Sequence, residues 1–162
     1  MTLELQNRAA ALLDTCRIRG IKIAAAESCT GGLVAALLTS IAGSSDVVDC
    51  GFVTYSNDAK QKMLGVPASL LNKHGAVSKE CAIAMVEGAL ANSNANLAVS
   101  ITGIAGPSGG TSAKPVGLVH FACVQKNGET LHREEKFGDV GREAVRMASV
   151  EVALALLESQ VL

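Results

Sequence analysis

Two short apolar runs, residues 21–26 and 97–101, constrain the fold most, because a polar, glycine-rich segment follows each of them directly. Runs of this length that end in such segments are typical of buried β-strands. Two further strands are expected on either side of Asn127-Gly128, a dipeptide typical of a hairpin turn. Helical patterns occupy residues 3–19, 33–41, 57–64, 78–91 and 140–157. Alternating helices and strands followed by a hairpin predict a layered α/β domain with a mixed sheet. No linker or repeat divides residues 1–162, so we expect one domain.

Composition excludes several classes of function. Charged residues make up 18% of the chain, the net charge is −1, and aromatic residues are few, so nucleic acid is not an expected partner. No apolar stretch is long enough to cross a bilayer, and the N-terminus lacks the apolar core of a signal peptide. We therefore expect a soluble, cytoplasmic protein without a membrane partner. The five cysteines form no C-x-x-C pair, so we expect reduced thiols, no metal and no cofactor.

The segment Glu27-Ser28-Cys29-Thr30-Gly31-Gly32 joins the first predicted strand to a helix. Backbone N–H groups at a helix N-terminus attract anions, so this segment is a candidate phosphate or oxyanion site. Ser28 is also a candidate nucleophile. The alternative is that Ser28 or Thr30 only caps the helix.

The only tyrosine of the chain, Tyr55, lies five positions before Lys60. A serine, a neutral lysine and a phenol can form a nucleophilic site that needs no histidine. Lys60 would have to lose its charge through desolvation, whereas a lysine near the start of a helix is normally solvated. We expect the strand at residues 47–55 to bring Ser45 into range of this pair. Ser45 is the first candidate for the nucleophile and Ser28 the second.

Two further segments provide candidate ligand-binding groups. Residues 102–115 form a glycine-rich loop after the second apolar run, where Thr102, Gly103 and Gly106 could contact a polar ligand. Arg142 is expected at the start of the last helix, where its charge opposes the helix dipole. A phosphate or carboxylate of a ligand would explain that position, and Asp139 or a surface location is the alternative.

The chain resembles the C-terminal domain of the competence/damage-inducible CinA family. Six ordered motifs carry the resemblance: Ala26-Glu-Ser-Cys-Thr-Gly-Gly32, Ile41-Ala-Gly-Ser-Ser45, Gly51-Phe-Val-Thr-Tyr-Ser-Asn57, His74-Gly-Ala-Val-Ser78, Ile104-Ala-Gly-Pro107 and Lys114-Pro-Val-Gly117. The resemblance implies a three-layer α/β/α sandwich with a mixed, mainly parallel sheet. It also implies a homo-oligomer and hydrolysis of the carboxamide of nicotinamide mononucleotide, without a metal.

The resemblance also implies roles for individual residues. Ser45, Lys60, Tyr55 and Ser28 are the implied catalytic group, while Thr30, Gly31, Gly32, Thr102, Gly103, Gly106 and Arg142 are the implied substrate-binding group. Two other classes of function stay open at this point. One is a non-catalytic nucleotide-binding module, and the other is a protein-interaction module connected with competence or DNA damage.

Overall fold

The computed structural model describes residues 1–161. Its elements in chain order are α1 (Leu3–Arg19), β1 (Ile23–Glu27), α2 (Leu33–Thr39), the 3-10 turn η1 (Ser44–Asp46), β2 (Val48–Val53), α3 (Asn57–Leu64), α4 (Ala68–His74), α5 (Lys79–Ala91), β3 (Leu97–Gly103), β4 (Leu118–Gln125), β5 (Leu131–Lys136) and α6 (Arg142–Val161). No helix in this part of the chain has the length and apolar character needed to cross a membrane.

The strands form one sheet in the order β2-β1-β3-β4-β5. β1 pairs in parallel with β2 and β3, whereas β4 pairs antiparallel with β3 and β5. The predicted α/β class with a mixed sheet is confirmed, and its parallel pairs are confined to the β2-β1-β3 half. Every residue of the interior strand β1 is buried. Its Ile-Ala-Ala-Ala-Glu sequence leaves room for helices on both faces.

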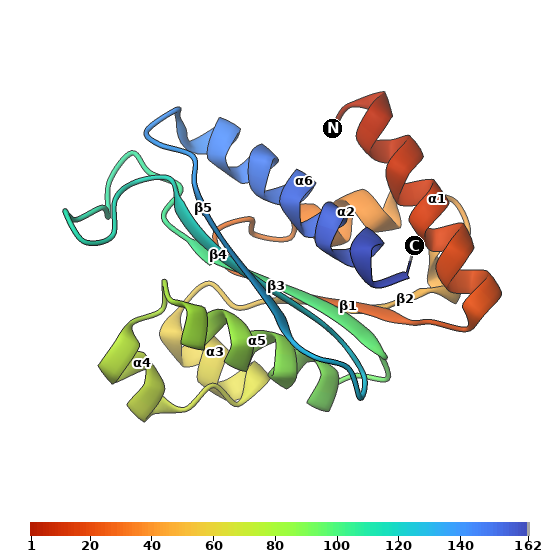
Figure 1. Cartoon of the computed structure of the whole chain (residues 1–162), viewed down its shortest axis with the longest axis horizontal. Coiled ribbons are helices and arrows are strands. Elements are labelled where there is room, and N and C mark those ends of the chain that lie inside the picture. The colour runs from red at the N-terminus through yellow and green to blue at the C-terminus, as the bar shows by residue number, and fades with distance from the viewer. Residues whose placement is uncertain (162) are drawn as a thin grey trace.

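The sheet lies between two layers of helices (Figure 1). Helices α1, α2 and α6 cover one face, and α3, α4 and α5 cover the other. Each face has its own aliphatic core: Ile23, Val99 and Phe121 belong to the first. Ala24, Ala98 and Met85 of α5 belong to the second. The alternation of inward side chains along the strands therefore accounts for the three-layer arrangement.

Local signals place the helix that carries Lys60. Ser56 caps α3 by accepting a hydrogen bond from the N–H of Ala59, and Gly65 ends the helix in the left-handed conformation at φ +70°. Helix α3 also approaches α5 very closely at Gly88. A Cβ atom on Gly88 would overlap the carbonyl oxygen of Leu64. This contact fixes α3 against the sheet layer and so fixes the direction of its side chains.

The three parallel strands end at the same edge of the sheet. Glu27 pairs with both Val53 and Ile101, so the segments that follow β1, β2 and β3 leave the sheet side by side. In doubly layered α/β proteins, ligands bind at the carboxyl ends of such strands. The candidate side chains after β1 and β2 therefore meet at this edge.

Candidate active site

Ser28 and Lys60 are in direct contact in the interior. The Nζ atom of Lys60 lies 3.0 Å from Oγ of Ser28 and 2.8 Å from the carbonyl oxygen of Thr54. Ser28 is the first residue after β1, and its N–H continues the ladder by donating to the carbonyl of Ile101. Lys60 lies in the first turns of α3, and only 1% of its surface is exposed. The sequence-based alternative of a solvated lysine is therefore wrong.

Burial lowers the pKa of Lys60 below the usual lysine value, because the charged ammonium loses its water. Both hydrogen-bond partners of Nζ are uncharged oxygens, so neither compensates with an opposite charge. The thiols of Cys29 and Cys81 lie near it. Burial raises the pKa of Cys29 to about 12 and that of Cys81 to about 11, which keeps both thiols protonated. The arrangement favours a neutral amine that can accept the proton of the Ser28 hydroxyl.

A cavity of about 260 Å³ opens beside this pair. It is lined by Ser28, Cys29, Tyr55, Lys60, Ala76, Val77, Thr102, Gly103, Ile104, Ala105, Gly106, Ser108, Gly109 and Arg142. The lining comes from the segments that follow β1 and β2, from the end of β3 and the loop after it, from the α4–α5 loop, and from the start of α6. The Oγ1 atom of Thr102 donates to the carbonyl of Ala76, which ties the end of β3 to the loop before α5.

Arg142 and Tyr55 form the outer wall of this cavity. One guanidinium nitrogen of Arg142 donates to the hydroxyl of Tyr55 at 2.7 Å, and another donates to the carbonyl of Gly106 at 3.0 Å. Tyr55 is 58% exposed and therefore lies at the mouth rather than beside the amine. The structure thus brings Tyr55 to Arg142, and both to the cavity that Lys60 lines.

The N-terminus of α2 is closed by the protein's own carboxylate. Glu27 is fully buried, and its side chain accepts hydrogen bonds from the N–H groups of Gly32, Val34 and Ala35 at 2.8 to 3.1 Å. The N–H of Gly31 donates to the carbonyl of Ser28. These backbone groups are already paired. The N–H groups of Gly31 and Gly32, which were expected to bind an anion, are therefore paired with other groups of the protein.

Ser45 is not brought to Lys60. It is exposed in η1, immediately before β2, whereas Tyr55 and Lys60 follow β2. The two ends of this strand lie at opposite edges of the sheet. Thr30, Gly31 and Gly32 also lie outside the cavity lining, although Thr102, Gly103, Gly106 and Arg142 belong to it.

A family model for the CinA C-terminal domain matches residues 5–161. The chain belongs to this family. Nicotinamide-nucleotide amidohydrolase PncC of Escherichia coli (strain K12) is 48% identical over 160 residues, which cover 98% of this chain and 96% of that protein. A CinA-like protein of Syntrophobacter fumaroxidans is 52% identical over 144 residues, which cover 89% of this chain. This chain spans only 34% of that longer relative.

Solved structures agree with the CinA fold. The crystal structure of competence/damage inducible protein CihA from Agrobacterium tumefaciens superposes with a TM-score of 0.95 at 51% identity, covering 98% of both chains. A CinA superfamily protein from Escherichia coli superposes with a TM-score of 0.91 at 31% identity, covering 99% of this chain and 93% of that one. The resemblance and the three-layer fold inferred from the sequence are confirmed.

Two charged residues of this CinA chain were not singled out from the sequence. Glu27 belongs to the segment at residues 27–32, and nothing in the sequence shows that its side chain turns back onto α2. Arg146 donates from Nε to the carbonyl of Cys29 and from Nη2 to the carbonyl of Thr30. A signal for Arg146 did exist, because residues four apart on a helix lie on the same side and Arg142 was already a candidate.

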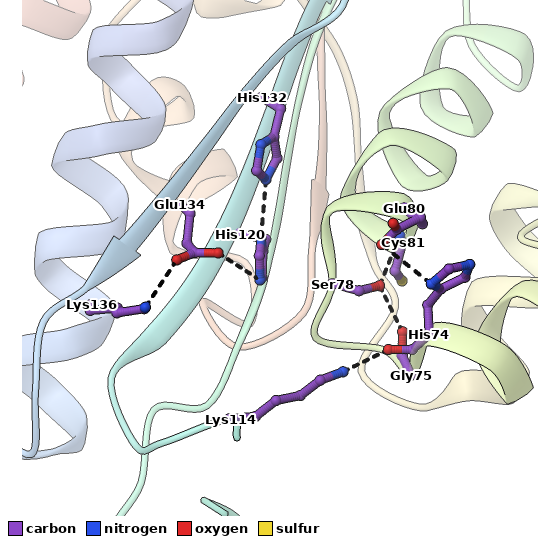
Figure 2. Close-up of polar contacts among 10 residues, drawn as sticks. All are labelled: His74, Gly75, Ser78, Glu80, Cys81, Lys114, His120, His132, Glu134 and Lys136. Carbon is purple, nitrogen blue, oxygen red and sulfur yellow. Dashed lines mark hydrogen bonds and ion pairs between the residues drawn. The ribbon is translucent and has the colours of Figure 1, made fainter. Parts of the chain in front are cut away.

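The three histidines, His74, His120 and His132, lie outside the lining of the cavity beside Ser28 and Lys60. His120 and His132 stack across β4 and β5, with 3.0 Å between Nδ1 of His120 and Nε2 of His132 (Figure 2). Glu134 lies beside His120, and Lys114 reaches across to the carbonyl of His74. Burial lowers the pKa of both His120 and His132, which favours neutral rings. The Lys114 contact joins the loop before β4 to the end of α4, whereas the histidine pair joins β4 to β5.

Proposed function

We propose that the protein is a nicotinamide-nucleotide amidase, which hydrolyses the carboxamide of nicotinamide mononucleotide to nicotinic acid mononucleotide and ammonia. One observation carries the proposal: a buried lysine of lowered pKa lies 3.0 Å from a serine hydroxyl beside a cavity. The relationship to PncC of Escherichia coli supplies the substrate class. A primary amide is a poor electrophile, so its hydrolysis needs such an activated nucleophile.

We assign the nucleophile to Ser28 rather than Ser45, and the base to Lys60, because Ser28 is the serine in contact with Nζ of Lys60. Oγ of Ser28 attacks the carboxamide carbon while its proton passes to Nζ of Lys60. The resulting ammonium then donates that proton to the departing nitrogen, which leaves as ammonia and gives a serine ester. Water then attacks the ester carbon while its proton passes to Lys60. The ester bond breaks, Oγ of Ser28 takes that proton back from Lys60, and the carboxylic acid is released. The carbonyl of Thr54 holds Nζ in place throughout.

Backbone amides next to Ser28 are suited to stabilising the oxyanion. In residues 1–161, the N–H groups of Cys29 and Thr30 make no hydrogen bond to another residue. Buried N–H groups are normally paired, so a ligand oxygen is a reasonable partner for them. The amide that follows a nucleophile commonly contributes to an oxyanion hole. We therefore assign this role to the N–H group of Cys29, which lines the cavity, and to that of Thr30, the next free amide of the same turn.

The ribose and phosphate would extend toward Arg142 and the glycine-rich loop at residues 103–109. The cavity lining contains two basic residues, Lys60 and Arg142. Arg142 is the one that lies at the mouth. Because Glu27 closes the N-terminus of α2, we assign the 5′-phosphate to Arg142 and the amides near Gly106 rather than to Thr30, Gly31 and Gly32. The hydroxyls of Tyr55 and Thr102 would bind the ribose.

An ammonia-release assay on nicotinamide mononucleotide, nicotinamide riboside and free nicotinamide tests the proposal. We expect the mononucleotide to be hydrolysed with the highest kcat/KM, because phosphate-binding groups left unpaired penalise the smaller amides. Lys60→Met should abolish release while the variant still binds the mononucleotide. A wild-type protein that binds the mononucleotide without releasing ammonia would instead be the non-catalytic module.

We further propose that residues 1–162 act as one amidase domain, that it works as a homo-oligomer, and that it works in the cytoplasm. The two aliphatic cores on the faces of one shared sheet support the proposal of a single domain. The five free cysteines support a reducing compartment. Light scattering of the purified protein would measure the oligomeric state.

A further inference from the structure

Arg146 donates two hydrogen bonds to the turn that carries Ser28. The turn runs from Ser28 to Gly31 and is closed by the hydrogen bond from the N–H of Gly31 to the carbonyl of Ser28 at 3.0 Å. The two carbonyls inside it, those of Cys29 and Thr30, accept from Nε and Nη2 of Arg146 at 3.1 and 3.0 Å. One forked guanidinium therefore fixes two successive peptide units.

Arg146 binds backbone carbonyls from a distant part of the chain rather than an acidic side chain. Within residues 1–161, Arg146 makes no salt bridge, in contrast to Arg8, which pairs with Glu158 at the surface. Its partners are backbone oxygens 116 and 117 positions away in the chain. Gly31, at φ +60°, leaves room for it, because a Cβ atom there would lie 3.3 Å from Nη2 of Arg146. The turn and the arginine are thus fitted to each other.

The contact controls the direction of an amide beside the nucleophile. In a trans peptide, the carbonyl and the N–H of one unit point to opposite sides. The carbonyl of Cys29 points to Arg146 on α6, so the N–H of Thr30, in the same unit, points away from α6. A cationic donor on that carbonyl also polarises the peptide and strengthens the N–H as a donor. The next unit is held in the same way through the carbonyl of Thr30.

We propose that Arg146 is a positioning residue for amide hydrolysis, which holds the Ser28–Gly31 turn so that its free N–H groups meet the oxyanion. The inference rests on the proposed function of the Ser28–Lys60 pair. Arg146 does not line the cavity beside that pair, so it acts through the turn and not by touching substrate. Arg142, one helical turn earlier, has the different task of binding the phosphate.

The test compares Arg146→Ala and Arg146→Lys with Arg133→Lys, a matched change on the exposed edge strand β5. We expect kcat for the mononucleotide to fall by about 100-fold in Arg146→Ala, the usual loss when one oxyanion contact or its alignment is removed. KM should change less than about threefold, because ground-state binding is untouched. Arg146→Lys should recover only part of kcat, since an ammonium cannot hold both carbonyls. Arg133→Lys should behave as wild type.

Chemical rescue separates positioning from a general loss of structure. A cavity of about 340 Å³ lined by Leu33, Arg142, Glu143, Arg146 and Met147 gives solvent access to the position of the guanidinium. Added guanidinium ion should therefore raise kcat of Arg146→Ala and leave that of Arg146→Lys unchanged. If Arg146→Ala does not fold, Arg146→Lys alone decides through its kcat and KM. An unchanged kcat, or a rise in KM with kcat preserved, overturns the proposal.

A second readout does not depend on the natural substrate. A fluorophosphonate reagent should label Ser28 of the wild type, and mass spectrometry would measure the rate. We expect Arg146→Ala to be labelled at least about tenfold more slowly, because the same amides stabilise the phosphonyl oxygen. If the wild type releases no ammonia but labelling still depends on Arg146, the proposed function fails and the positioning role stands. Equal labelling rates overturn the positioning role.

Discussion

Nζ of Lys60 and Oγ of Ser28 are 3.0 Å apart, although 32 positions separate them in the chain. The parallel pairing of β1 with β2 creates this contact. Glu27 lies opposite Val53, so the chain leaves both strands at the same edge, and Ser28 and the segment leading to α3 become neighbours. The capped start of α3 then directs Lys60 inward, beneath Ser28 and the carbonyl of Thr54.

Replacing each candidate serine tests which one is the nucleophile. Ser28→Ala should lower kcat for ammonia release at least about 1,000-fold, as expected when a nucleophile is lost. Ser45→Ala should stay within about twofold of the wild type, because Ser45 is exposed beyond the far end of β2. Steady-state kinetics of the two variants measures this. The reverse pattern would restore Ser45 as the nucleophile.

Lys60 should make stability rise with pH. Its pKa is lowered in the folded protein, so the unfolded chain binds more protons between the folded pKa and the ordinary value near 10.5. Unfolding free energy then increases with pH in that window, by at most about 1.4 kcal/mol per pH unit for one proton, and the gain is lost as pH falls.

Lys60→Met isolates this effect, since methionine fills similar space without a charge. The variant should show a smaller rise in unfolding free energy between pH 7 and 9.5, measured by urea denaturation, and its kcat should fall at least about 100-fold. Lys62→Met, an exposed change on the same helix, is the control. Identical pH slopes in wild type and Lys60→Met would show that Lys60 keeps its charge.

Arg142 should govern affinity for the phosphate. Arg142→Lys should raise KM for the mononucleotide about tenfold with little change in kcat, because a lysine cannot bind the phosphate and the Gly106 carbonyl in the same forked geometry. KM for the riboside, which has no phosphate, should hardly change. An equal effect on both substrates would place the phosphate elsewhere.

The buried carboxylate of Glu27 should contribute strongly to stability. Glu27→Gln replaces an acceptor of three N–H groups with a neutral amide that can match them only in part. We expect the unfolding free energy to fall by about 2 kcal/mol, the usual scale for a charge-assisted bond in the interior. Glu87→Gln on the exposed side of α5 is the matched control. Equal denaturation midpoints would mean that α2 does not depend on this cap.

The positions of the helices and strands could be predicted because their signals are local. Ser56 and Gly65 mark both ends of α3, and Asn127-Gly128 marks the hairpin between β4 and β5. The prediction that Ser45 lies near Tyr55 and Lys60 was wrong because strand β2 separates them. Six residues of β2 span about 20 Å, so residues before and after it cannot share a site within one chain.

Burial and side-chain contacts across the fold could not be predicted from the sequence. Lys60 has the sequence context of a surface residue, and only the close approach of α3 to α5 and the sheet removes it from water. Arg146 binds carbonyls that carry no sequence information, because every residue has one. Tyr55 was predicted beside the lysine, yet it faces Arg142 at the mouth.

The capping of α2 by Glu27 determines which part of the chain can attract an anionic ligand. Since the positive end of that helix is neutralised, attraction for an anionic substrate depends on the start of α6, at the other end of the chain. In the proposed mechanism, the reacting groups are Ser28 and Lys60, and the phosphate-binding group is Arg142. In that mechanism, substitutions in α6 would alter which amides are accepted and leave the Ser28–Lys60 pair intact.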